Sequence, residues 1–508
     1  MLARIFSAAT VGLTVRQIEV EVDVEKRGFP TFKIVGLPDK AVEEAKERIR
    51  AAMSNSKVSF PKHKVIINLA PADIPKAGPS FDLPMALGIL IAHGQLAPLK
   101  EKSLFLGELS LNGTVRRVNG ILPIVMAAKE KGFKKIFIPQ ENAQEGALVS
   151  GIKVYPIKSL RQLIFSLFGE KTLSPVSPLS FANLHQQNEA EFDFADIVGQ
   201  ETAKRALEIA AAGGHNVFMK GPPGAGKTML ARALPGILPA MTEKEALEVT
   251  KIYSIAGQLK AHQSLISRRP FRSPHHTISR IGLIGGGTHP APGEVSLAHR
   301  GALFIDEAPE FPRHVLEALR QPLEDGQVTI ARAAGSYTFP AKFTLIAAAN
   351  PCPCGWFGDP YHQCHCLPGQ ITRYQKKISG PLMDRIDIHL NIPSVKIEKL
   401  TGEKKTRHET SLEVRKRVEK ARQRQQKRFL NTTLTCNAEM NTKEVKSFCQ
   451  LSPEGRNLLN RAAHRLALSA RSYYRLIKVA QTIADLDNQE KIHTPHIAEA
   501  LQYRRLDN

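Results

Sequence analysis

The sequence is poor in aromatic residues and cysteine: of its 508 residues, 6% are aromatic, one is tryptophan and six are cysteine. No run approaches the roughly 18 apolar residues that a membrane span needs, and the best candidate, Leu83–Ala92, is too short. The first 15 residues carry one arginine and a weak apolar run, which gives no secretory signal. So few cysteines in so long a chain also exclude a secreted disulfide framework. We therefore expect a cytoplasmic protein with no membrane partner.

Positive charge is abundant. Lysine and arginine number 70 against 48 acidic residues, a net charge of +22, and half of this excess follows residue 395. The segment Lys404–Arg428 alone holds 11 basic and three acidic residues. This balance indicates a polyanionic partner, usually nucleic acid bound through its backbone, although a solvated basic surface is the alternative.

Composition and periodicity divide the chain into three parts joined by a linker. Residues 1–170 mix strands such as Ile18–Val24, in which apolar and charged residues alternate, with helices such as Lys40–Ser54. Residues 171–190 are rich in Ser, Pro, Asn and Gln, which is typical of a linker. Residues 191–393 give a second α/β pattern, and residues 394–508 become helical. The fold class predicted is α/β.

A complete phosphate-binding motif opens a helix in the second part. It follows an apolar strand and fits G-x-x-x-x-G-K-[ST]. Its residues are Gly221, Pro222, Pro223, Gly224, Ala225, Gly226, Lys227 and Thr228. The glycines let backbone N–H groups cradle phosphates, and the helix N-terminus adds positive potential. We expect Lys227 to reach the β- and γ-phosphates of ATP and Thr228 to ligate Mg²⁺.

Polar residues end two further apolar strands. Asp306 and Glu307 follow Ala302–Ile305, and Asn350 follows Phe343–Ala349. Asp306 suits Mg²⁺, Glu307 suits polarising the attacking water, and Asn350 suits orienting it. A capping Asp-Glu pair and a turn asparagine are the alternatives.

These elements, in this order, resemble AAA+ ATPases. The segments Arg269–Thr277, Gly285–His299, Asn350–Gly355 and Ile378–Ile388 resemble the magnesium-chelatase-like branch, and within it the ComM/YifB family, over nearly the whole chain. The resemblance implies a P-loop AAA+ core at 191–393 and a basic C-terminal helical lid at 394–508. It also implies a homo-hexameric ring with ATP sites between subunits.

The resemblance assigns roles to two arginines. Arg385 matches the arginine finger that reaches the neighbour's γ-phosphate, although an ion pair with a flanking aspartate would also explain it. Arg471 matches the sensor-2 arginine of the lid, with Arg475 and Lys478 on the same helix as competitors.

Two segments are candidates for gripping DNA in the ring pore. Lys227 and Asp306 are 79 positions apart, which leaves room for an insertion, and 327–341 resembles a pre-sensor hairpin. The candidate DNA contacts are Arg269, Arg272, His275, His276 and Arg332. Structural loops that hydrogen-bond locally are the alternative.

Four cysteines, Cys352, Cys354, Cys364 and Cys366, fall within the insertion 351–367. Four thiolates make a closed tetrahedral site that suits structural Zn²⁺. His362 or His365 as a replacement ligand, an iron–sulfur cluster and free thiols are the alternatives.

The N-terminal domain resembles the Lon protease domain (ribosomal-S5-domain-2-like) through Gly78–Ser80 and Gly107-Glu108. Ser80 matches the family's serine, but Ile124 stands where its lysine is expected. Without a base the hydroxyl is not activated, so we expect no proteolysis.

The resulting hypothesis is an ATP-dependent DNA motor. By resemblance, its task is helicase or branch-migration activity during integration of DNA in recombination or natural transformation. A metal-chelatase motor and a nucleotide-switched scaffold are the alternatives.

Overall fold

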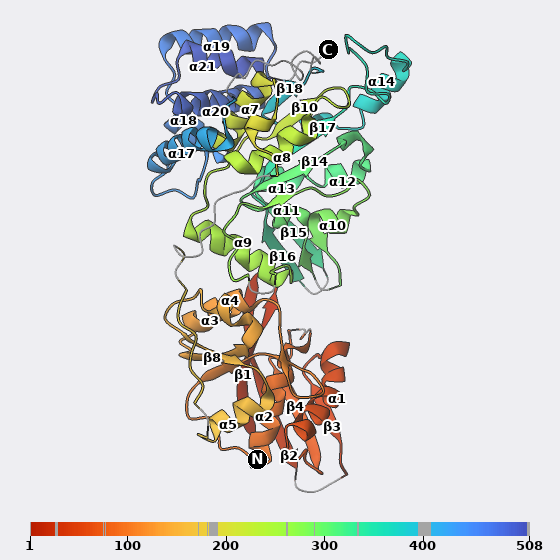
Figure 1. Cartoon of the computed structure of the whole chain (residues 1–508), viewed down its shortest axis with the longest axis vertical. Helices are drawn as coiled ribbons and strands as arrows, with labels where there is room; N and C mark the ends of the chain where they lie inside the picture. Colours follow the sequence, from red (N-terminus) through yellow and green to blue (C-terminus); the bar gives the residue numbers. More distant parts are fainter. Residues whose placement is uncertain are drawn as a thin grey trace.

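The computed structural model describes residues 2–25, 29–74, 76, 78–170, 172–179, 181, 191–260, 263–288, 290–332, 335–394 and 408–504. The N-terminal domain occupies one end of an elongated molecule, and the C-terminal helices occupy the other (Figure 1). The predicted linker falls partly outside the described residues. Its described part runs along the N-terminal domain, where Val176 N–H donates to the Val154 carbonyl.

The N-terminal domain is built on a seven-stranded mixed sheet in the order β3-β4-β2-β1-β5-β8-β9. These strands are β1 Ala3–Val11, β2 Thr14–Glu25, β3 Phe32–Val35, β4 Lys64–Ala70, β5 Ser103–Phe105, β8 Lys135–Pro139 and β9 Lys153–Ile157. A separate two-stranded ribbon pairs β6 Glu108–Leu109 with β7 Val115–Arg116. The alternation in β2 buries Ile18, Val20, Val22 and Val24, as the pattern predicts.

The helices of this domain are α1 Lys40–Asn55, α2 Asp82–Ala92, α3 Ile121–Glu130, α4 Ala143–Gly146 and α5 Leu160–Leu167. Asp39 caps α1 by accepting from Val42 N–H at 2.8 Å, which confirms the predicted start of this helix. Every residue of α2 is buried, in keeping with its apolar sequence.

The N-terminal domain is docked on the second domain through buried polar contacts. Glu145, which is buried, accepts from Leu122 N–H at 2.8 Å and from Ser254 Oγ at 2.5 Å. Gly120 N–H donates to the Ser254 carbonyl at 3.1 Å. Leu13, in the β1–β2 turn, packs against two hydrophobic clusters of the second domain. A buried carboxylate with these partners fixes one domain on the other.

The second domain contains a five-stranded parallel sheet in the order β11-β14-β17-β10-β18. Its strands are β10 Val217–Lys220, β11 Phe271–Arg272, β14 Ala302–Ile305, β17 Thr344–Ala349 and β18 Ile388–Asn391. All residues of β14 and β17 are buried, as expected for a parallel sheet covered on both faces. Two hairpins extend from this domain: β12 Gly285–Gly286 with β13 Ala291–Pro292, and β15 Gln327–Arg332 with β16 Gly335–Pro340.

The C-terminal helices share one hydrophobic core with one face of this sheet. The cluster includes Leu207 of α7, Leu230 of α8, Val418 of α17 and Ile483 of α20.

The helices of the second domain are α7 Glu201–Gly213, α8 Lys227–Ile237, α9 Glu243–Ile255, α10 Arg280–Ile284, α11 Glu294–Leu297, α12 Arg313–Glu317, α13 Arg320–Asp325, α14 Pro368–Gln375 and α15 Gly380–Met383. The C-terminal helices are α17 Ser411–Arg428, α18 Thr442–Phe448, α19 Pro453–Arg465, α20 Ala470–Leu486 and α21 Thr494–Gln502. No helix among the described residues is long and apolar enough to cross a membrane.

Candidate nucleotide site and metal centre

The phosphate loop connects β10 to α8, as the motif predicts. Gly224 and Gly226 have φ values of 74° and 89°, a region that side-chain-bearing residues rarely adopt. A Cβ on Gly221 would stand 2.3 Å from the Ile392 carbonyl oxygen, so only glycine permits this close approach to the end of β18. A Cβ on Gly224 or Gly226 would meet nothing within 4 Å, so the loop has open space beside both glycines.

Lys227 begins α8 and turns its ammonium back over the loop. Its Nζ donates to the carbonyls of Gly221 at 2.6 Å and Pro222 at 2.7 Å, and to Asn350 Oδ1 at 3.1 Å. Burial lowers the pKa of Lys227, and the nearby Asp306 and Glu307 oppose this shift. Among the described residues, the hydrogen-bond partners of this buried cation are neutral oxygens, which phosphate oxygens can replace.

Thr228 and Asp306 meet at the carboxyl edge of the sheet. Thr228 Oγ1 donates to Asp306 Oδ2 at 2.9 Å, so the two predicted Mg²⁺ ligands are adjacent. Glu307 is exposed beside them and adopts a left-handed conformation at φ 48°. A left-handed non-glycine residue costs about 1–3 kcal/mol, and such strain is concentrated at functional sites.

The position of Asn350 follows from the strand order. Because β17 lies between β10 and β14, Asn350 at its tip stands between the loop that carries Lys227 and the acidic pair. Gln200, which the sequence reasoning missed, joins the same region. Its Nε2 donates to the Ala225 carbonyl at 3.3 Å and to the Pro393 carbonyl at 2.8 Å. No local spacing pattern marks Gln200, because its partners lie far away in sequence.

Arg385 and Arg471 lie at the opposite edge of the sheet from the phosphate loop. Asn216, which precedes β10, donates to the Arg385 carbonyl at 3.0 Å. A strand of four to six residues spans roughly 13–20 Å, so neither arginine belongs to the phosphate site of its own chain. The two arginines share one partner, Glu324 of α13, which the sequence reasoning did not single out.

The two competitors of Arg471 have structural partners. Arg475 pairs with Asp387 at 3.0 Å, and Lys478 donates to the Ala438 carbonyl at 3.0 Å. Burial lowers the pKa of both side chains. Arg471 is instead half exposed, at the mouth of a cleft of about 820 Å³ between the sheet edge and the C-terminal helices.

Two of the predicted DNA contacts are engaged inside the protein. Arg269 is largely buried, pairs with Glu245 at 3.0 Å and donates to the carbonyls of Pro239 and Arg300. Arg272 makes a bidentate pair with Glu294 at 2.6 and 2.7 Å. Both guanidiniums are thus paired within the protein and bridge distant segments, and contact of Arg269 and Arg272 with DNA stays a prediction.

The other candidates are more accessible. His275 is exposed and His276 is half-buried, and their ring centroids lie 4.0 Å apart with the planes tilted by 35°. Arg332 is exposed in the β15–β16 hairpin, and its Nη2 lies 3.7 Å from where a Cβ of Gly286 would stand. The two hairpins are therefore neighbours on one surface.

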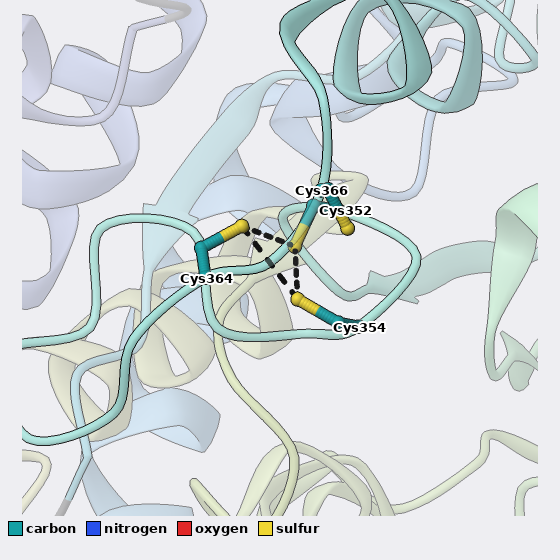
Figure 2. A group of neighbouring side chains, drawn as sticks. All are labelled: Cys352, Cys354, Cys364 and Cys366. Carbon is teal, nitrogen blue, oxygen red and sulfur yellow. Dashed lines mark hydrogen bonds between the residues drawn. The ribbon is translucent and has the colours of Figure 1, made fainter.

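The four clustered cysteines converge on one point (Figure 2). The Sγ of Cys352 lies 3.3 Å from that of Cys354 and 3.7 Å from that of Cys364. All four sulfurs lie within 4.8 Å of one another. Tetrahedral Zn²⁺ at about 2.3 Å from each sulfur would set them about 3.8 Å apart. The donor set and its spacing therefore fit zinc, whereas the His362 ring stacks on Trp356 and bonds to Asp359.

The ionisation of the thiols supports the same fit. Backbone N–H groups of Trp356 and His365 lower the pKa of Cys354 to about 6. The Cys366 N–H favours the thiolate of Cys364, yet burial and the neighbouring sulfurs raise the pKa of Cys364 to about 12. Crowded thiols cannot all ionise without a cation between them.

The cysteine loop touches the phosphate loop. A Cβ on Gly355 would stand 2.6 Å from Pro223 Cδ, and Gln375 Nε2 donates to the Pro351 carbonyl at 2.9 Å. The loop thus packs beside Asn350 and buttresses the site.

Among the described residues, no hydrogen bond joins the Ser80 hydroxyl to a lysine. Ile124, at the position where the family's lysine is expected, is buried in a hydrophobic cluster. Lys129 is exposed and packs beside Gly151. Lys76 is buried, donates to the Pro71 carbonyl, and has its pKa lowered by burial.

A parallel sheet in which the strand of Asn350 separates those of Lys227 and Asp306 has the AAA+ arrangement of P-loop ATPases. Three family profiles match the chain: "Magnesium chelatase, subunit ChlI" over residues 193–400, "Subunit ChlI of Mg-chelatase" over 20–142, and "Magnesium chelatase, subunit ChlI C-terminal" over 408–504. Together with the relatives described next, they show that the chain belongs to the ComM/YifB family of magnesium-chelatase-like AAA+ ATPases.

Full-length relatives support this assignment. The chain is 43% identical to "Competence protein ComM" of Haemophilus influenzae, over 99% of this chain and 98% of the relative. It is 40% identical to "Uncharacterized protein YifB" of Escherichia coli, over 100% and 97%. A stretch of 96 residues, 18% of the chain, is 38% identical to "Lon protease 2" of Bacillus subtilis.

Proposed function

We propose that this protein is a cytoplasmic, ATP-driven DNA motor, a hexameric helicase or branch-migration translocase that promotes integration of DNA in recombination or natural transformation. The observation that carries the proposal is that Lys227 and Arg385 lie at opposite ends of the parallel strands, one strand length apart. The phosphate loop lies at one edge of the sheet, and Arg385 and Arg471 lie at the other. The arginines of one subunit could therefore complete the phosphate site of the next. Head-to-tail contacts of this kind form a ring when the rotation from one subunit to the next closes.

Catalysis would then be divided between two subunits. Lys227 would bind the β- and γ-phosphates of ATP, and Thr228 and Asp306 would hold Mg²⁺, which when bound would supply neutralisation of the phosphate charge. Glu307 accepts a proton from the attacking water, and Asn350 orients that water. Arg385 and Arg471 of the next subunit stabilise charge on the γ-phosphate.

Three observations support DNA as the partner. The net charge is +22, Arg332 lies exposed beside Gly286 where the two hairpins meet, and the Haemophilus influenzae relative described above is named a competence protein. Contacts of this kind go to the phosphate backbone, so binding would be independent of sequence and would weaken with salt. The magnesium-chelatase profiles favour a second candidate, a chelatase motor, whose hydrolysis would respond to protein partners and not to DNA.

The test is ATP hydrolysis and strand displacement on a labelled forked or three-stranded DNA. We expect DNA to stimulate hydrolysis and strands to separate only while Lys227 is intact, with Lys227→Ala as the control. Hydrolysis that ignores DNA and separates no strands would contradict the motor and favour the chelatase candidate.

The hairpin surface gives a narrower prediction. In Arg332→Ala, we expect DNA-stimulated hydrolysis and strand displacement to fall together. Arg332 would contact the phosphate backbone of DNA, so the loss should be the same for every DNA sequence. Arg313→Ala, which removes an exposed arginine of α12, serves as the matched control. The slope of DNA affinity against salt should become shallower in Arg332→Ala only.

We propose that Cys352, Cys354, Cys364 and Cys366 hold one structural Zn²⁺. We expect metal analysis to find about one zinc per chain, and Cys354→Ser to lose it and lower the melting temperature. Cys436→Ser, which alters a buried cysteine outside the cluster, should keep the metal. Iron with visible absorbance would favour the iron–sulfur alternative, and no metal would favour free thiols.

A further inference from the structure

Glu324 ends up between two arginines that come from distant parts of the chain. It lies on α13, whereas Arg385 precedes β18 and Arg471 begins α20. Arg471 Nη2 donates to one carboxylate oxygen of Glu324 at 2.5 Å, and Arg385 Nη2 donates to the other. The hydrogen bond from Arg385 is the main cause that lowers the pKa of Glu324, so this carboxylate is charged.

Two guanidinium groups that converge on one carboxylate form an anion site. Each guanidinium has donors in a fork that suits carboxylates and phosphates alike. The site is also incompletely filled, because Arg385 Nε is buried and has no acceptor among the described residues. Without an anion between them, the two cations would repel each other.

We propose that Glu324 is a positioning residue that keeps Arg385 and Arg471 together in the free subunit and gives them up to the phosphate of the neighbour's ATP as the ring closes. This rests on the proposed function, since it needs both arginines to act on the next subunit. Glu324 and Arg471 are each about half exposed, at 46% and 49%, so their ion pair is solvated and weak enough to exchange, whereas the Arg385 side chain is 16% exposed. A carboxylate held in this way competes with ATP.

The competition predicts a specific kinetic signature for Glu324→Gln. We expect the half-saturating concentration of ATP for hydrolysis to fall about 2–5-fold, the effect of losing an exposed ion pair. At saturating ATP the phosphate has already displaced the carboxylate, so kcat should follow the wild type. A non-hydrolysable ATP analogue should likewise assemble rings at a lower concentration.

Two controls separate this role from a structural one. Asp325→Asn removes the same charge from the neighbouring residue, which makes no ion pair with either arginine among the described residues, and should leave the half-saturating ATP concentration unchanged. Salt near 0.5 M should bring Glu324→Gln and the wild type together, because it screens exposed pairs. A merely structural glutamate would not show this convergence.

The outcomes distinguish the inference from the function on which it rests. If Arg385→Ala loses hydrolysis but Glu324→Gln has an unchanged or raised half-saturating ATP concentration, the role of Glu324 is overturned and the intersubunit site stands. If Arg385→Ala keeps full hydrolysis, the intersubunit site itself fails. A lower half-saturating ATP concentration in Glu324→Gln that persists at high salt would also count against electrostatic competition.

Discussion

Replacing Glu307 with glutamine is expected to lower kcat for ATP hydrolysis by about 10²–10⁴-fold, the contribution of a positioned general base. The amide cannot accept the proton of the attacking water. Lys227, Thr228 and Asp306 remain in place, so ATP should still bind with nearly unchanged affinity. Steady-state hydrolysis and binding of a fluorescent ATP analogue measure the two quantities separately.

The control for this variant is Glu310→Gln. Glu310 is an exposed carboxylate three residues further on, and it pairs with Lys377 at 3.6 Å. The Glu310→Gln variant should hydrolyse ATP at the wild-type rate. By contrast, Lys227→Ala should lose ATP binding and hydrolysis together. The Lys227 ammonium is expected to contact the phosphates both in bound ATP and in the transition state. Glu307→Gln with more than half of the wild-type kcat would show that another group activates the water.

Replacing Arg385 with alanine is the second change with a large expected effect. An arginine finger contributes about 10³–10⁵-fold to hydrolysis, so Arg385→Ala should be almost inactive. ATP binding should persist, because Arg385 lies at the far edge of the sheet from its own phosphate loop. Loss of activity with binding retained would show that Arg385 is needed for hydrolysis but not for holding ATP in its own subunit.

Arg313→Ala again supplies the matched arginine control and should keep its activity. Circular dichroism and melting temperature would show whether Arg385→Ala folds, since Arg385 also bonds to the Pro381 carbonyl at 2.7 Å. A folded Arg385→Ala chain with full activity would remove Arg385 from the reaction.

The parts of the site that depend on short local patterns could be predicted from the sequence. The phosphate loop, the acidic pair and Asn350 each end an apolar strand, and parallel strands bring such ends to one edge. The predicted strand Ala302–Ile305 agrees with the structure residue for residue, and the predicted helix Lys40–Ser54 differs from α1 by one residue at its end. These segments carry strong periodic or fully apolar signals that tertiary packing does not override.

The parts that depend on distant partners could not be predicted. Nothing local to Arg269 or Arg272 shows that Glu245 and Glu294 neutralise them. The edge of the sheet on which Arg471 docks is set by packing of the C-terminal helices against α7 and α8, not by its own neighbours. The strand β1 also escaped prediction, because Ala3–Val11 is rich in small residues and lacks alternating charge.

Hydrolysis between two subunits is tested most directly by mixing two inactive variants. The Glu307→Gln subunit supplies Arg385 to its neighbour but cannot activate water. The Arg385→Ala subunit can activate water but supplies no arginine to its neighbour. In randomly mixed rings about one quarter of the interfaces would combine an intact phosphate site with an intact arginine. We predict that hydrolysis returns to about that fraction of the wild-type rate on mixing. A mixture as inactive as its components would contradict an ATP site shared between subunits.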